Sequence, residues 1–149
     1  MAVTNISKFE RFFRAAAGLD VDKADLKHYS DFVHRKIYDL LLMSQAAAKF
    51  NQRDVIEFWD LPITKGLQES IHAYERLDEQ IELETVMRGL TQLPPLDLEY
   101  GEETRAKLPS LHGGLSFALA QSFKIVDPHL KNPQTQHWAT TFKLFDLLL

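Results

Sequence analysis

The sequence predicts an all-α protein built from two tandem units, each with a short, a long and a short helix. Two long amphipathic stretches, residues 24–50 and 108–126, carry apolar residues three or four positions apart. Each is preceded by a similar link, Leu19-Asp20-Val21-Asp22 in the first half and Leu96-Asp97-Leu98-Glu99 in the second. One helix triplet cannot bury its own apolar faces, whereas two triplets packed together can. We therefore interpret the repeat as a duplication within one compact domain, 1–149.

The first unit, residues 1–76, begins with a short helix followed by a long one. Residues 6–17 have apolar side chains at helical spacing, and Gly18 stands where helices often end. The next helix, over 24–50, is expected to be about 40 Å long at 1.5 Å per residue. A helix of that length overshoots a compact domain of this size unless other elements cross it near its middle.

A third helix is expected to close the first unit. Residues 51–54 break the helical pattern, and residues 55–59 are β-prone and aromatic. Pro62 then permits a helix to begin. Its apolar stripe comprises Ile63, Leu67, Ile71 and Tyr74.

The second unit, residues 77–149, repeats this plan. A short helix is expected over 81–90, the link follows at 94–100, and the second long helix contains the stripe over 108–126. Asp127-Pro128 ends that helix. The last helix is strongly apolar, so the chain is expected to end in its core; its apolar residues are Trp138, Phe142, Phe145 and Leu148 or Leu149.

The second long helix contains three residues that disfavour helix interiors. Pro109 is expected in a first turn, where its missing N–H is harmless. The adjacent Gly113 and Gly114 each cost about 1 kcal/mol relative to alanine in a helix interior. We expect these two glycines to let another helix cross closely.

Composition limits the classes of function. The net charge is −4, and all the excess acid lies in the second half: residues 1–74 carry ten basic and ten acidic side chains, and residues 75–149 carry seven and eleven. This balance disfavours strong non-specific DNA binding, although a local basic patch is compatible with it. The absence of cysteine excludes disulfides, thiolate zinc sites and cysteine nucleophiles.

Targeting signals are not evident in the sequence. The N-terminus lacks the charged and then apolar layout of a signal peptide, and no apolar run approaches the roughly 20 residues of a membrane span. A cytoplasmic protein that does not enter a membrane is therefore expected.

With these features the chain resembles the histone fold, and in particular a family of uncharacterised bacterial proteins (DUF1931-like) that carry two histone-fold units in one polypeptide. Arg53 and Asp60 resemble the arginine and aspartate that clamp the second loop of a histone fold to its third helix. The corresponding loop of the second unit, residues 131–136, has no arginine. The resemblance implies an intramolecular pseudodimer of units 1–76 and 77–149, able to exist as a monomer.

The resemblance also implies candidate phosphate contacts, because histones bind DNA through positive charge on the first helix and at paired loops. Acidic residues stand in both links, where DNA-binding histones would prefer lysine or arginine. The alternative is therefore that the basic residues at these positions are ordinary solvated charges. The candidates are Arg11, Arg14, Lys49 and Arg53.

A catalytic function finds little support. Glu69 and His72 have the E-x-x-H spacing of di-metal helical bundles, and Asp25 and His28 have the same spacing with a less typical acidic residue. Such sites also need carboxylates from two further helices. We therefore predict no catalytic residue, cofactor or metal. The large aromatic residues are interpreted as core rather than as a nucleic-acid stacking surface; they include Phe12, Phe58, Trp59 and Trp138.

Three functions remain open from the sequence. The first is a histone-like scaffold that binds double-stranded DNA or a protein. The second is a protein-interaction module that does not bind DNA. The third, of low weight, is a helical metalloenzyme built around Glu69 and His72.

Overall fold

The residues that the structure describes are mainly helical, with one two-stranded parallel sheet of two residues per strand. The computed structural model describes residues 3–81 and 93–149. The elements of these ranges are α1 (Val3–Ala17), α2 (Lys23–Phe50), β1 (Val55–Ile56), the 3₁₀ helix η1 (Phe58–Asp60), α3 (Lys65–Ile81), β2 (Glu99–Tyr100), α5 (Glu102–Val126) and α6 (Thr135–Leu148). The short helix expected over 81–90 lies outside the described residues, apart from Ile81, which ends α3.

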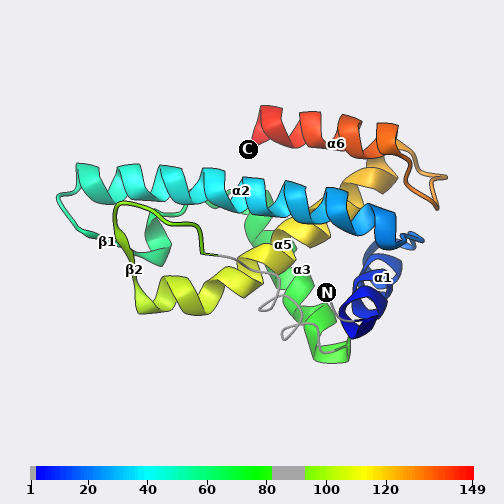
Figure 1. The fold of residues 1–149 in the computed structure, drawn as a ribbon, viewed down its shortest axis with the longest axis horizontal. Coiled ribbons are helices and arrows are strands. Elements are labelled where there is room, and N and C mark those ends of the chain that lie inside the picture. The colour runs from blue at the N-terminus through cyan, green and yellow to red at the C-terminus, as the bar shows by residue number, and fades with distance from the viewer. Residues whose placement is uncertain (1–2, 82–92) are drawn as a thin grey trace.

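The two long helices form the centre of the molecule (Figure 1). Helix α2 is 28 residues long and begins at a capping box, in which the Asp22 side chain accepts hydrogen bonds from the N–H groups of Ala24 and Asp25. Helices α1 and α3 pack against α5, and α6 lies beside α2. The core between them is rich in aromatic side chains, which include Phe9, Phe12, Phe13, Tyr29, Phe32, Phe123 and Trp138.

Helix α6 is attached to α2 by both apolar and ionic contacts. The ring of Phe32 stacks on Phe142, with centroids 4.7 Å apart, and meets the edge of Phe145 at 5.0 Å. Asp146 Oδ1 lies 2.6 Å from the Nζ of the buried Lys36 and 3.0 Å from Arg35. One carboxylate of α6 therefore neutralises two cations of α2.

The links of the two halves pair with each other. Strand β1 pairs in parallel with β2, with Val55 opposite Glu99 and Ile56 opposite Tyr100. At the other end of α2, the N–H of Asp20 donates to the carbonyl of Lys131 at 2.7 Å. At each end of α2, a connecting segment of the first half thus pairs with a connecting segment of the second half.

The close helix crossing expected at the glycine pair is confirmed. A Cβ on Gly114 would lie 2.4 Å from Ile71 Cγ1, and one on Gly113 would lie 2.4 Å from the ring of Tyr74. These two residues of α3 occupy the space that any larger residue would need. Glycine at both positions is therefore required by the α3–α5 packing.

Several boundaries differ from the sequence predictions. Helix α5 begins at Glu102, so Pro109 lies inside the helix and not in its first turn, and α5 bends in its first half (Figure 1). Helix α3 begins at Lys65 rather than at Pro62, because the Thr64 hydroxyl accepts the N–H of Leu67 at 3.1 Å and caps the helix. The unit boundary drawn after residue 76 falls within α3, which continues to Ile81.

Two predictions about the core need correction. Trp59, which was expected in the core, lies in η1 and is 69% exposed. The final helix buries Trp138 and Phe145, but its last turn leaves Leu147 80% exposed and Leu148 75% exposed. Leu149, by contrast, is partly buried against the core, so the last turn of α6 is partly core and partly an exposed apolar surface.

Candidate functional site

Arg53 is held by a two-bond ion pair with Asp60. Its Nη1 donates to Asp60 Oδ2 at 2.8 Å and its Nη2 donates to Oδ1 at 2.6 Å. The Asp60 side chain is only 3% exposed and also accepts the N–H of Glu57 at 2.9 Å. The hydrogen bond from Arg53 is the main reason why the pKa of Asp60 lies below its usual value. The pair fixes the chain between α2 and η1.

The end of α2 directs Arg53 towards this partner. Gln52 has a positive φ of 60°, Arg53 N–H donates to the carbonyl of Ala48 at 2.9 Å, and Gln52 N–H donates to that of Lys49 at 3.0 Å. This is the Schellman pattern of helix C-termini. The guanidinium also lies 5.9 Å from the ring centroid of Trp59.

Lys49 and Arg14, two other candidate phosphate contacts, also face carboxylates. Lys49 Nζ donates to Asp97 Oδ2 at 2.9 Å, and this bond lowers the pKa of Asp97. Arg14 Nε lies 3.6 Å from Asp20 Oδ1, with both side chains more than half exposed. Both partners belong to the repeated links, which therefore act as internal counterions for the nearby cations.

The four candidates do not form one patch. Arg11 and Arg14 lie on α1, close to the start of α2, whereas Lys49 and Arg53 lie at its far end (Figure 1). A 28-residue helix separates the two groups by about 40 Å. Arg11 is exposed, and no ion pair of this residue occurs within residues 3–81 and 93–149.

The pair proposed for a metal site is used in surface contacts. Glu69 accepts from Lys65 at 2.7 Å, which lowers the pKa of Glu69, and His72 Nε2 lies 3.0 Å from Gln68 Nε2. His28 stacks on Trp138 with centroids 5.9 Å apart. Among the described residues, no cluster of three or more His, Cys, Asp or Glu side chains is placed to hold a metal ion.

A buried polar cluster at the crossing of α2 and α5 was not predicted. Tyr29 Oη lies 2.7 Å from Ser116 Oγ, which itself lies 2.7 Å from the backbone carbonyl of His112. Ser116 has one proton, which goes to that carbonyl, so Tyr29 donates to Ser116. His112 Nδ1 lies 3.5 Å from Tyr29 Oη, and within the described part of the chain its Nε2 has no hydrogen-bond partner.

Burial determines the protonation states in this cluster. Desolvation lowers the pKa of His112 to about 3, with a smaller contribution from the nearby His34, and raises the pKa of Tyr29 above its usual value. Both side chains are therefore neutral near pH 7. Helical spacing alone could have suggested contact between Tyr29 and the second long helix. It could not have identified Ser116 as the hydrogen-bond partner of Tyr29.

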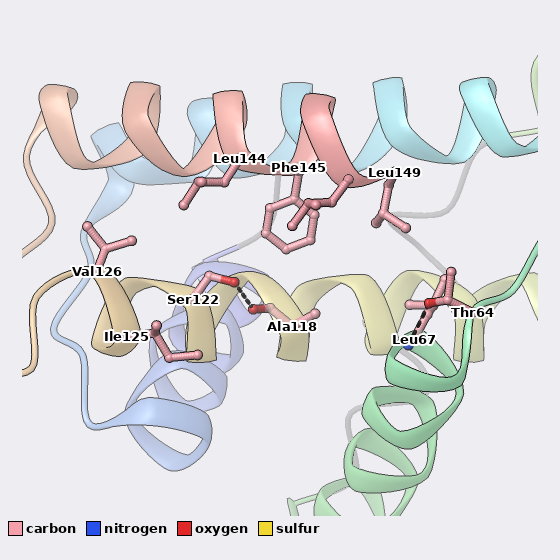
Figure 2. Close-up of a pocket in the computed structure, with 10 residues that line it drawn as sticks. Thr64, Leu67, Ala118, Ser122, Ile125, Val126, Leu144, Phe145 and Leu149 are labelled. Atoms are coloured by element: carbon pink, nitrogen blue, oxygen red, sulfur yellow. Dashed lines mark hydrogen bonds between the residues drawn. The ribbon is translucent and has the colours of Figure 1, made fainter.

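An apolar groove lies between α5, α6 and the start of α3 (Figure 2). Its volume is about 320 Å³. Eight of its ten lining residues are apolar, and the other two are Thr64 and Ser122. Sequence reasoning missed this groove, because the leucines of the last helix have the same spacing as core residues.

Comparison with models of known protein families identifies the family of this chain. A family model described as "Domain of unknown function (DUF1931)" matches residues 9–146. The chain belongs to the DUF1931 family. In the described residues of this DUF1931 chain, no helix is both long and apolar enough to cross a membrane.

The chain is also similar to individual relatives. Two proteins of Aquifex aeolicus (strain VF5), both described as uncharacterized, are similar in sequence. One is 24% identical over 117 residues, covering 78% of this chain and 68% of the relative. The other is 28% identical over 137 residues, covering 82% and 78%.

Two crystal structures have the same overall fold. One, from Thermus thermophilus, is 52% identical with a TM-score of 0.85 and covers 97% of both chains. The other, a 1.9 Å structure of an Aquifex aeolicus protein, is 21% identical with a TM-score of 0.84 and covers 97% of this chain and 95% of the other. At that identity the second likeness concerns the fold alone.

Proposed function

We propose that this chain is a non-enzymatic scaffold protein in which two tandem histone-fold units form an intramolecular pseudodimer. Its contacts are made through protein surfaces rather than through DNA phosphates. The observation that carries this proposal is that three of the four candidate phosphate contacts, Arg14, Lys49 and Arg53, already face carboxylates of the same chain.

Two pairings between the halves support the pseudodimer. The segment between α2 and α3 pairs with the link before α5 through β1 and β2. In the same way, the link before α2 meets the segment between α5 and α6 through Asp20 and Lys131. Such exchange is expected of two similar units related by an approximate twofold axis. The ion pair between Arg53 and Asp60 also has the positions of the histone-fold clamp.

Electrostatics favours protein contacts over DNA. A phosphate can bind Lys49 or Arg14 only if it competes with Asp97 or Asp20, and each carboxylate would repel it. Arg53 is less available still, because its partner is a buried carboxylate that it holds through two hydrogen bonds. The net charge of −4 adds a general repulsion.

DNA binding is the second candidate, and the placement of the cations favours it. The two basic groups lie about 40 Å apart along α2, which is close to the roughly 34–36 Å of one turn of DNA. Arg11 is exposed and would be the first contact. A DNA-binding function therefore predicts that both groups reach one duplex.

Fluorescence anisotropy with double-stranded DNA, at low and at physiological salt, separates these candidates. We expect weak or undetectable binding by the natural chain at physiological salt. The double variant Asp20→Asn/Asp97→Asn, which frees Arg14 and Lys49, should bind DNA more tightly and with a steeper salt dependence. The double variant Glu75→Gln/Glu79→Gln, at two exposed positions of α3, has the same net charge and is the matched control.

The opposite results would support a histone-like DNA function. Salt-sensitive binding by the natural chain, weakened when Arg11, Arg14, Lys49 and Arg53 are replaced by alanine, would overturn the scaffold proposal. Equal binding by the two double variants would show that total charge matters and the internal ion pairs do not. Stoichiometric iron or manganese in the purified protein would instead revive the metalloenzyme alternative at Glu69 and His72.

A further inference from the structure

The groove beside α6 is lined mainly by apolar side chains. Its two hydroxyls each make a hydrogen bond within the chain: Thr64 Oγ1 accepts the N–H of Leu67 at 3.1 Å, and Ser122 Oγ donates to the carbonyl of Ala118 at 2.7 Å (Figure 2). None of the ten lining residues is charged. An occupant of this groove must therefore present apolar side chains.

Protruding aliphatic residues stand next to the groove. Ile125 is 80% exposed at the end of α5, and Leu147 and Leu148 are similarly exposed at the end of α6. Leu144 lies one turn before Leu148 on the same face of α6. We name this surface the C-terminal apolar face; it comprises Ile125, Val126, Leu144, Leu147 and Leu148.

The two halves pack their last helices differently against the long helices. At an offset of 82 residues between the long helices, Phe32 of α2 corresponds to Gly114 of α5. Gly114 lets Ile71 of α3 approach the backbone of α5, whereas the ring of Phe32 stands between α2 and Phe142 of α6. Helix α3 therefore packs directly on the backbone of α5, whereas α6 packs on α2 through aromatic rings. The groove itself lies between α6 and α5.

The equivalent surface of the first half is polar. The exposed side chains of α3 are mostly charged or hydrogen-bonding, whereas those of the last turn of α6 are leucines. The described part of α3 therefore presents no counterpart of the C-terminal apolar face. The exposed polar residues of α3 are Lys65, Gln68, Glu69, His72, Glu75, Arg76 and Glu79.

We propose that the C-terminal apolar face binds a second copy of this chain across a twofold axis and forms a closed pair. The face carries both a groove and the side chains that could fill it, which is the self-complementarity that a twofold interface requires. Burial of its five aliphatic residues from each copy would remove on the order of 1,000 Å² of surface, the size at which specific interfaces begin. Because a twofold interface uses the same face on both copies, association ends at two chains.

Sedimentation velocity over a range of concentrations tests this inference. We expect a species of twice the 17.2 kDa of one chain, and no larger species. Leu147→Glu should shift the protein to the single-chain mass, because it places a charge in the interface. Ile125→Glu should do the same from α5, which makes the result independent of any single substitution.

Phe50→Glu is the matched control. Phe50 is 87% exposed but lies at the far end of α2, away from α6 (Figure 1), so this variant should remain paired. Circular dichroism of each variant verifies that its helix content is unchanged. A single-chain mass for the natural protein at all soluble concentrations, or open-ended oligomers, would overturn the closed pair. Dissociation by Phe50→Glu with no effect of Leu147→Glu would assign the interface elsewhere.

The inference extends the scaffold proposal to a definite partner, but its test is separate from the DNA experiment. None of the four candidate phosphate contacts lines the groove. DNA binding by a paired protein would overturn only the scaffold proposal, and a single-chain protein that does not bind DNA would overturn only the pairing.

Discussion

At the scale of single residues, the most unusual feature is a neutral histidine at the centre of the molecule. His112 is buried where α2 and α5 cross, with the ring of Tyr29 at 5.9 Å and that of His34 at 6.1 Å. Protonation would place a charge in surroundings where no carboxylate of the described residues contacts the ring. The fold is therefore expected to resist protonation of His112, at a cost in stability under acidic conditions.

This cost predicts a pH dependence of stability. Since the pKa of His112 is about 3 in the folded chain and 6.5 when unperturbed, the unfolded state binds one more proton between these values. The contribution is fully present above pH 6.5 and is lost as the pH falls towards 3, by up to about 1.4 kcal/mol per pH unit. Urea unfolding between pH 7 and 4, values that bracket most of this window, measures it.

His112→Gln should have a flatter profile than the natural chain, whatever its stability at neutral pH. His129→Gln, at an exposed position, should keep the natural slope. Equal slopes for His112→Gln and the natural chain would contradict the assignment of this pH dependence to His112.

At the scale of elements, the two halves solve the same packing problem with different residues. In one half, Gly113 and Gly114 remove side chains from α5 so that α3 can cross against its backbone. In the other half, Phe32 on α2 meets two aromatic rings of α6. The α3–α5 contact thus pairs glycines with large side chains, whereas the α2–α6 contact pairs large side chains with each other. The groove lies between α5 and α6 and reaches the start of α3.

Substitution of Gly114 tests the close crossing. Gly114→Ala should lower the free energy of unfolding by about 1–3 kcal/mol, because the new Cβ would meet the Cα of Ile71 at 3.0 Å as well as its side chain. The matched control is Gly66→Ala in α3, where nothing lies within 4 Å of the added Cβ. It should raise stability by up to about 1 kcal/mol through helix propensity. Similar stabilities of the two variants in urea would rule out the steric account.

At the scale of the whole molecule, the interleaved pairing of the links ties the halves into one unit. Each end of α2 is joined to the second half, through β1 and β2 at one end and through Asp20 and Lys131 at the other. Aromatic contacts add to this, since Trp138 of α6 contacts Phe13 of α1 and Phe123 of α5. Neither half can separate without exposing these rings.

Unfolding should therefore be cooperative over both halves. We expect far-UV circular dichroism, which reports all helices, and the fluorescence of Trp138, which reports the second half, to give the same midpoint in urea. Trp59→Phe removes the signal of the exposed Trp59, so that the emission comes from Trp138 alone. Two separated midpoints would show instead that the halves fold independently.

Local patterns in the sequence were enough to predict the helical class, the long helix over 24–50 and the close crossing at the glycine pair. These features depend on local periodicity or on the absence of a side chain, and both can be read along one segment. The link repeat was also visible, because Leu19 and Leu96 begin similar short motifs. The candidate cations could also be named from the sequence, because residue type and position along the chain are enough to choose them.

The partners that these segments take depend on the three-dimensional packing. The carboxylates that face Arg14 and Lys49 are six and 48 residues away along the chain, and spacing cannot specify a contact between side chains on different elements. The same holds for the exposure of Trp59 and Leu148, whose apolar character predicted burial. Periodicity identifies the apolar face of a helix, but whether another element covers that face depends on how all the helices pack together.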